Sequence, residues 1–376
     1  MGTASAGITG IGSYLPSGRV SAEELAHLTG LPAWVVEQKL GLVERVVAGP
    51  DDHPAAMGVW AAERALADAA VSPDDVDVVI SITEEYKEYP VWTAGIKLAY
   101  DVGARNAYAY DIGQKCGTTV LALKQAKDLL RADETVNTVL IAGGYRNSDL
   151  IDLQDPDVRF MYNLGAGGGA LVVQRGPVEA DAKPRVHELL GSSFITDGSF
   201  SLDVLVPVGG TKAPLNAANV GDYRLQVADP AGMKARLEQS SLDNFIKVVE
   251  QAVERSAATT ADIDYLAMLH VKRSAHDYLL GRLGLPEERS IYLNHYGHIG
   301  QVDQILSLEL ARQAGKLKAG DLAVLVAAGV GYVWNAICLR WGAGVGAGAA
   351  AVGGATTAAG VGATSAAGLN PSGAAR

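Results

Sequence analysis

The chain of 376 residues contains only two cysteines and lacks long uninterrupted apolar runs. Two cysteines exclude a disulfide-rich secreted scaffold, and in a reducing compartment both thiols can stay free. No apolar run reaches the roughly 18 residues that a membrane span requires. The first residues lack the basic segment of a secretory signal peptide. The sequence therefore predicts a cytoplasmic protein that has no membrane partner.

Clusters of positive charge are also missing. The formal net charge is −11, and lysine and arginine nowhere form a block. Since an acidic surface repels phosphate backbones, nucleic-acid binding is excluded as the main function. The length allows two domains of ordinary size or one large two-lobed domain.

Bulky side chains are scarce in the C-terminal segment 343–376. It consists almost wholly of Ala, Gly, Val, Thr and Ser, and Arg376 is its only charged residue. Too little apolar surface is available there to offset the entropy of ordering. We predict a disordered tail, and the alternative, an anchor for a membrane or partner, is disfavoured by the glycines. The folded body then spans about residues 5–342.

The body alternates short apolar runs with longer amphipathic segments. Such alternation indicates an α/β fold with buried sheets. The predicted strands are 7–11, 76–83, 106–112, 136–143, 168–173, 263–270, 290–294, 323–328 and 336–341. The predicted helices are 21–28, 55–70, 91–101, 118–132, 237–259, 274–283 and 303–314.

The order of elements repeats along the chain. The strand entry at 72–82 is similar to that at 260–269, and strands and helices follow in the same order in both places. A repeat of this size predicts two halves, 5–176 and 177–342, packed as a pseudo-dimer. Two unrelated α/β stretches are the alternative. If the halves are equivalent, the carboxyl ends of their strands converge at a ligand site.

Reactive side chains occupy the ends of these strands. Cys116 lies between a predicted strand and a predicted helix, where the helix dipole and free N–H groups stabilise a thiolate. His270 ends an apolar strand, a position that suits proton transfer. Taken alone, either residue could instead be a core residue with its partners satisfied. Cys338, on the last predicted strand, is expected in the core.

A turn equivalent to the one holding Cys116 contains His298, with His295 close by. A metal pair of these two histidines is disfavoured because no third ligand is near. The glycine loop around Gly331 can bring backbone N–H groups close to a substrate oxygen, or it is an ordinary hairpin turn. A thiol, an imidazole and backbone donors together favour acyl transfer through a thioester.

Five motifs occur in a fixed order along the body. They are Gly10-Ile-Gly-Ser-Tyr-Leu-Pro, Trp34 with Leu40-Gly-Leu-Val-Glu-Arg45, Tyr110-Asp-Ile with Cys116, the glycine-rich segment 164–173, and Gly329-Val-Gly-Tyr-Val-Trp-Asn. In this order they resemble the beta-ketoacyl-acyl-carrier-protein synthase III family of the thiolase-like superfamily. The resemblance covers nearly all of residues 7–341. It implies a five-layered αβαβα duplicated fold and a homodimer.

The resemblance also implies roles for individual residues. Cys116 would be the acylated nucleophile and His270 a catalytic histidine, and the backbone N–H groups of Cys116 and Gly331 would form the oxyanion hole. Trp34 would flank the tunnel for the pantetheine arm of the substrate, and Arg45 belongs to the same substrate-binding segment. The substrate would be an acyl-CoA or acyl-carrier-protein thioester, with no cofactor and no metal.

Three departures from the family pattern change the expected chemistry. His298 replaces an asparagine, the segment after His270 reads Val-Lys-Arg, and Thr83-Glu84-Glu85 replaces small polar residues. The Thr-Glu pair resembles that of hydroxymethylglutaryl-CoA synthases, in which the glutamate is a general acid or base. Glu84 is therefore a further catalytic candidate, although a solvated loop would carry the same residues.

The leading hypothesis is an acyltransferase of fatty-acid or polyketide-type specialised metabolism. It would load Cys116 and condense the acyl group with a malonyl thioester by decarboxylation. His270 and His298 would stabilise the enolate or move protons. The alternatives are ester- or amide-forming transfer, a non-decarboxylating condensation of the hydroxymethylglutaryl-CoA synthase type, and a non-catalytic partner subunit of a ketosynthase.

Overall fold

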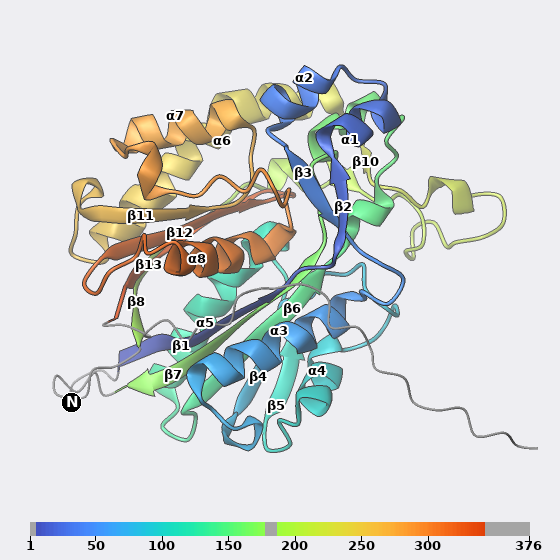
Figure 1. The fold of residues 1–376 in the computed structure, drawn as a ribbon. Helices are drawn as coiled ribbons and strands as arrows, with labels where there is room; N and C mark the ends of the chain where they lie inside the picture. Colours follow the sequence, from blue (N-terminus) through green and yellow to red (C-terminus); the bar gives the residue numbers. More distant parts are fainter. Residues whose placement is uncertain (1–4, 177–185, 343–376) are drawn as a thin grey trace, which may run out of the picture. The chain divides into compact units, whose positions relative to one another are not determined.

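The structure is a computed structural model that describes residues 5–176 and 186–342. The described elements belong to one compact unit (Figure 1). The predicted tail at 343–376 lies outside the described residues, and so does 177–185, where the predicted second half begins. The boundaries of the two halves and of the tail therefore stay predictions.

The large sheet of the described chain is mixed and has nine strands in the order β11-β12-β13-β8-β1-β7-β6-β4-β5. Their bounds are β1 (Ser5–Tyr14), β4 (Val78–Ser81), β5 (Tyr108–Asp111), β6 (Thr138–Tyr145), β7 (Gly167–Gly176), β8 (His187–Thr196), β11 (Ile263–Met268), β12 (Leu322–Gly329) and β13 (Val333–Arg340). Two small sheets pair β2 (Gly18–Ser21) with β3 (Glu44–Val47) and β9 (Val204–Leu205) with β10 (Gln226–Val227).

Strand order and strand direction repeat across the middle of the large sheet. On one side β4 pairs parallel with β6, β6 antiparallel with β7, and β7 antiparallel with β1. On the other side β11 pairs parallel with β12, β12 antiparallel with β13, and β13 antiparallel with β8. The two sets meet where β1 pairs with β8 at only two residue pairs. The duplicated α/β fold predicted from the sequence is confirmed.

Helices form three layers around the two sets of strands (Figure 1). The first set carries α3 (Pro54–Ala69) and α4 (Ala94–Val102), and the second carries α6 (Pro230–Glu254) with α7 (Arg273–Leu283) against it. Between the two sets lie α5 (Thr118–Ala132) and α8 (Asp303–Gln313), which contact strands of both. The short α1 (Ala22–Thr29) and α2 (Ala33–Val35) precede β3. Every helix in the described ranges is too short or too polar to cross a bilayer.

The central helix α8 begins with polar side chains inside the protein. Gln301, Asp303, Gln304 and Ser307 have no exposed surface. Buried polar groups are costly unless they are hydrogen-bonded, so each must serve a partner within the core. A polar helix start at this depth indicates a functional centre rather than packing alone.

Glycines in the opening strand β1 allow α3 to approach closely. A Cβ at Gly10 would lie 2.1 Å from the carbonyl oxygen of Ala65, and one at Gly12 would lie 2.4 Å from that of Ala61. Any side chain there would push α3 away from the sheet. The first motif of the sequence therefore has a packing function.

One predicted strand is wrong, and five observed strands are not predicted: β2, β3, β9 and β10 of the small sheets, and β8 of the large sheet. Residues 290–294 form no ladder, although Leu293 is buried and Ser290 Oγ donates to the carbonyl of Leu266 at 2.8 Å. The segment resembles a strand in composition because it is partly buried, although it does not pair with a sheet. Conversely, Gly191 and Ser192 interrupt the apolar pattern of β8, so its sequence does not predict a strand.

Candidate active site

Cys116 lies in a tight turn between β5 and α5. The residue before it, Lys115, has a φ angle of +53°, which is a strained conformation for a residue with a side chain. Thr118 holds the turn, because its Oγ1 accepts from Gln114 N at 2.8 Å and donates to the Lys115 carbonyl at 2.6 Å. The thiol is thereby placed just ahead of the first turn of α5, where backbone N–H groups stabilise a thiolate.

The thiol of Cys116 contacts the imidazole of His298. The distance from Sγ to Nε2 is 3.1 Å, and the distance from His298 Nδ1 to Oδ2 of Asp303, the first residue of α8, is 2.6 Å. Because a carboxylate only accepts, Nδ1 carries the proton and Nε2 is free to take the thiol proton. Thiol, imidazole and carboxylate thus follow the order of a catalytic triad.

Asp303 holds this arrangement from inside the core. Its carboxylate accepts from His298 and also from the backbone N–H groups of His270 at 2.8 Å and Ile299 at 2.7 Å. Burial alone would lower the pKa of His298, but the charges of Asp303 and Cys116 outweigh it, and the pKa of His298 rises well above its ordinary value. The geometry therefore favours transfer of the Cys116 proton to His298.

His270 lines the same cavity but has no free ring nitrogen. Its Nε2 lies 3.1 Å from the carbonyl oxygen of Gly41, and its Nδ1 lies 2.9 Å from Nδ2 of Asn163. Since the carbonyl can only accept, Nε2 carries the proton and Nδ1 accepts from the amide. Burial lowers the pKa of His270 to about 4, so the ring is neutral at physiological pH.

Three buried histidines make the folded state sensitive to acid. Burial lowers the pKa of His187 to about 3 and the pKa values of His270 and His276 to about 4. Their ordinary pKa in an unfolded chain is about 6.5, so their stabilising contribution is full above that pH and is lost as the pH falls towards 4.

We expect the free energy of unfolding to drop between about pH 7 and pH 5 by up to roughly 2 kcal/mol for each histidine. Denaturant titrations at the two pH values measure this drop. His276→Gln removes one of the three groups and should make the drop smaller. An unfolding free energy that does not change over this range contradicts the expectation.

Glu84 follows β4 and lines the cavity that contains Cys116. Its side chain is buried, and Oε2 accepts from Nδ2 of Asn147 at 2.8 Å, whereas Oε1 accepts from no described residue. Burial raises the pKa of Glu84, against the opposing charge of Lys115. The neighbouring Glu85 forms an ion pair with Lys115 and stands more exposed. Glu84 is therefore not part of a solvated loop.

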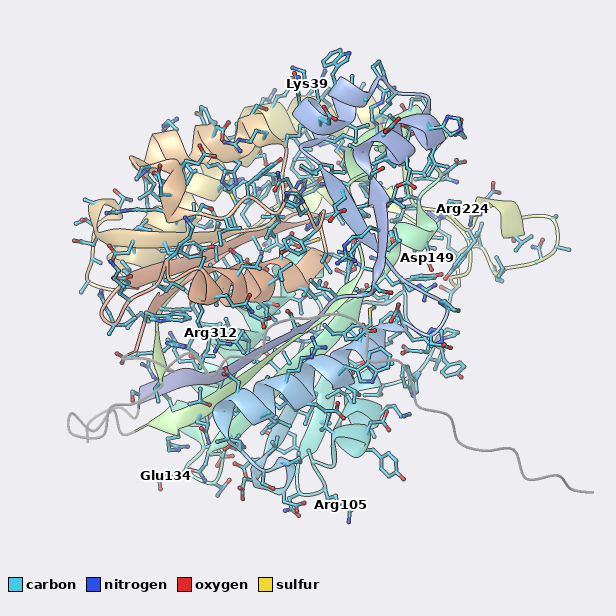
Figure 2. All side chains as sticks on the ribbon, viewed as in Figure 1. Lys39, Arg105, Glu134, Asp149, Arg224 and Arg312 are labelled. Carbon is cyan, nitrogen blue, oxygen red and sulfur yellow. The ribbon has the colours of Figure 1, made fainter. Side chains whose placement is uncertain are left out.

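The cavity that joins these groups holds about 1360 Å³. Cys116, His270, His298 and Glu84 all line it, and most of its remaining wall is apolar. Four exposed cations line it, namely Lys39, Arg159, Lys234 and Lys272, of which Lys234 forms an ion pair with Glu238. Figure 2 labels Lys39 on the segment that follows α2.

Two residues predicted to bind substrate lie elsewhere. Trp34 is half exposed on α2 and is not among the described residues that line the cavity, although its neighbour Val35 is, so its contact with a pantetheine arm stays a prediction. Arg45 is buried, and its Nη1 donates to the carbonyl of Leu164 at 2.6 Å. Leu164 bridges to His298, so Arg45 supports the backbone beside His298 instead of lining the cavity.

The loop predicted to complete the oxyanion hole is close to Cys116, but through a different glycine. A Cβ at Gly329 would lie 3.2 Å from Cys116 N, whereas one at Gly331 would meet nothing within 4 Å. Of this loop, Val330 and Tyr332 line the cavity and Gly331 does not. The role of Gly331 N–H as the second donor therefore stays a prediction.

No metal cluster of histidine, cysteine and carboxylate side chains is present in the described part of the chain. His295 is exposed while His298 is buried, so the two do not share a site. Asp303 and Asn163 are residues of the candidate site that sequence reasoning missed. A fully buried aspartate at a helix start, five positions after a candidate histidine, is the signal that could have identified Asp303.

Two segments of the chain match protein-family models. Residues 110–198 match the family described as 3-oxoacyl-[acyl-carrier-protein (ACP)] synthase III, and residues 253–341 match the C-terminal part of the same synthase. In these two segments the chain is similar to the beta-ketoacyl-ACP synthase III family. It is accordingly an acyltransferase of the condensing-enzyme class.

Relatives of this synthase family match along almost their whole length. A beta-ketoacyl-[acyl-carrier-protein] synthase III of Allorhizobium ampelinum is 28% identical over 337 residues, which cover 89% of this chain and 98% of the relative. The crystal structure of the synthase III of Thermus thermophilus is 25% identical with a TM-score of 0.76, covering 90% of this chain and 100% of that chain. The priming beta-ketosynthase of the R1128 polyketide pathway shares the fold at a TM-score of 0.76 and 24% identity, covering 89% and 95%.

Proposed function

We propose that this synthase III-like enzyme loads an acyl group onto Cys116 and passes it to an oxygen or nitrogen nucleophile. The proposal rests on the hydrogen bonds that link Cys116 to His298 and His298 to Asp303. His298 takes the thiol proton, Sγ attacks the thioester carbonyl, and the departing thiolate recovers the proton from His298. The same imidazole then takes a proton from the acceptor as the acceptor attacks the acyl-Cys116 carbonyl.

The donor that we propose is an acyl-CoA or acyl-carrier-protein thioester. Lys39, Arg159 and Lys272 make no side-chain hydrogen bond or ion pair with the described residues and are therefore available at the cavity rim. Free cations suit the phosphates of such a carrier, and the apolar wall suits an acyl chain. The thioester carbonyl would then reach Cys116, with Cys116 N–H as the first donor to its oxygen.

The state of His270 supports transfer without decarboxylation. Decarboxylation of a malonyl thioester needs donors aimed at the enolate oxygen. His270 has its one N–H bonded to the Gly41 carbonyl and its other nitrogen bonded to Asn163. His298, held by Asp303, directs Nε2 to the thiol. This arrangement supplies a base at His298 and leaves no N–H of His270 free for an enolate.

Decarboxylative condensation is the second candidate, favoured by the names of the relatives. It would require His270 to release the Gly41 carbonyl when substrate binds. Non-decarboxylating condensation would use Glu84 as the base at carbon. A non-catalytic subunit is the least supported alternative, because such a subunit does not need the hydrogen-bonded triad of Cys116, His298 and Asp303.

A two-substrate assay tests the proposal. The purified protein is first loaded from each acyl-CoA of a panel and is then incubated with malonyl-CoA that is radiolabelled in its free carboxylate. We expect one acyl group per chain by intact-protein mass spectrometry and no release of labelled carbon dioxide. Carbon dioxide released by the loaded enzyme would favour the condensing reaction instead.

We also propose that the chain forms a homodimer across the edge of the large sheet. β5 is the last strand on one side and pairs only with β4. Exposed apolar side chains gather beside it, including Tyr108 on β5 and Ile96 and Tyr100 on α4. A free strand edge next to such a patch is a favourable surface for a second copy of the chain.

A further inference from the structure

Glu84 has an unused carboxylate oxygen in the cavity of Cys116. The residue is only 6% exposed, and Oε2 is bonded to Asn147, but Oε1 is buried and has no partner among the described residues. Leaving a buried carboxylate oxygen unpaired is costly, so a hydrogen-bond donor from a ligand would stabilise it. The Cys116–His298–Asp303 chain does not use this group.

Glu84 is held in a fixed position relative to His298. Gln301, three residues after His298 and fully buried, donates through Nε2 to the carbonyl of Ile82 at 2.7 Å and to the end of β6 at 3.2 Å. Ile82 precedes Glu84 by two residues, and Asn147 follows β6 by two. The turn that carries the imidazole and the strand end that carries the carboxylate are therefore tied together, which preorganises both groups.

The carboxylate of Glu84 has no positively charged side chain paired with it among the described residues. Lys115, whose charge acts on Glu84, forms its ion pair with Glu85. Glu84 itself has no salt bridge to any described residue. A neutral hydroxyl group would supply a hydrogen bond to Oε1 but no positive charge, whereas an ammonium group would supply both.

We propose that Glu84 binds and deprotonates the acceptor, and that the acceptor is a primary amine that enters as its ammonium ion. The inference rests on the proposed function, because it needs the acyl-Cys116 intermediate. It narrows the reaction to amide formation and gives the two bases of the cavity separate tasks. Glu84 serves the incoming nitrogen, and His298 serves the sulfur.

The protons balance in this scheme. The ammonium ion gives one proton to the Glu84 carboxylate and becomes a neutral amine. Its nitrogen attacks the acyl carbon, the C–N bond forms, and His298 Nε2 takes a second proton from the nitrogen. The C–Sγ bond then breaks, which leaves Cys116 as a thiolate beside protonated His298 and releases the amide. Glu84 returns its proton to water, so each turnover of thioester and ammonium yields amide, free thiol carrier and one proton.

A single-turnover experiment tests the inference. Cys116 is loaded from hexanoyl-CoA, excess thioester is removed, and loss of the acyl mass is followed with methylamine and benzylamine against methanol and benzyl alcohol. We expect at least one amine to accelerate deacylation and neither alcohol to do so comparably. Glu84→Gln should reduce the amine-dependent rate by about 10²-fold more than it reduces acylation of Cys116, the size expected for loss of a general base.

Glu134→Gln is the matched control, since Glu134 is an exposed carboxylate outside the residues that line the cavity, and its amine-dependent rate should stay near that of the wild type. If the wild type never gains an acyl group, the proposed function fails and this inference falls with it. If Cys116 loads normally, the inference alone fails when alcohols match amines, when no amine accelerates deacylation, or when Glu84→Gln deacylates like the wild type. If Glu84→Gln does not fold, Asn147→Ala, which removes the hydrogen bond that holds Glu84 Oε2, takes its place and should also lower the amine-dependent rate more than acylation.

Discussion

The Cys116→Ala protein is expected to gain no acyl mass from any acyl-CoA, whereas the wild type gains one acyl group per chain. Sγ of Cys116 is the atom that lies 3.1 Å from the catalytic imidazole, and alanine has no atom that can form the thioester. Transfer to an acceptor should fall by at least about 10³-fold. Intact-protein mass spectrometry and release of free coenzyme A measure the two effects.

Cys338 provides the matched control for this experiment. It is fully buried on β13, and burial raises its pKa to about 11, so it stays a protonated thiol. Cys338→Ala should therefore load as the wild type does. An acyl group found on Cys116→Ala, at Cys338 or elsewhere, would contradict the assignment of the nucleophile.

Asp303→Asn is expected to slow acylation of Cys116 by about 10²–10⁴-fold without removing any group that touches substrate. The carboxylate accepts from His298, His270 N and Ile299 N, and one amide oxygen cannot accept all three bonds. Without the carboxylate charge, the pKa of His298 loses the main influence that raises it. The ionisation of His298 in the pH–rate profile should therefore move to lower pH.

Asp264→Asn separates this effect from general destabilisation. Asp264, near the start of β11, accepts one hydrogen bond from Leu322 N at 2.9 Å and lies at the opposite end of the strand from His270. It should change stability without moving the pH–rate profile. If Asp303→Asn acylates at the wild-type rate, Asp303 does not position His298 for catalysis.

The repeat in the sequence was sufficient to bring the main reactive groups together. Cys116 precedes α5 and His298 precedes α8, and these two helices form the central layer between the two sets of strands. Equivalent positions of two copies must meet near the axis that relates them, so the contact between thiol and imidazole follows from the pattern of elements. The bounds of α5 were also predictable, because long periodic segments carry strong signals, whereas α6 (Pro230–Glu254) begins and ends before its predicted range 237–259.

Residues that act through hydrogen bonds from distant segments could not be predicted in the same way. An aspartate at a helix start is typical of favourable dipole interactions, so the sequence gives Asp303 an ordinary structural explanation. Asn163 contacts the ring of His270 from 107 positions away. Arg45 matches a family motif, yet the structure uses it to hold the backbone at Leu164. Motif and spacing indicate which residues are reactive but not which atoms they reach.

The pairing between β1 and β8 is short, and the geometry of the candidate site depends on how the two sets of strands are aligned. The two sets of strands share only two residue pairs there, while the nucleophile comes from one set and the base from the other. A small shear between the sets would lengthen the path of the transferred proton before either set lost its own hydrogen bonds. The contact between Cys116 and His298 therefore depends on the alignment of the two sets, which α5 and α8 maintain through their contacts with strands of both.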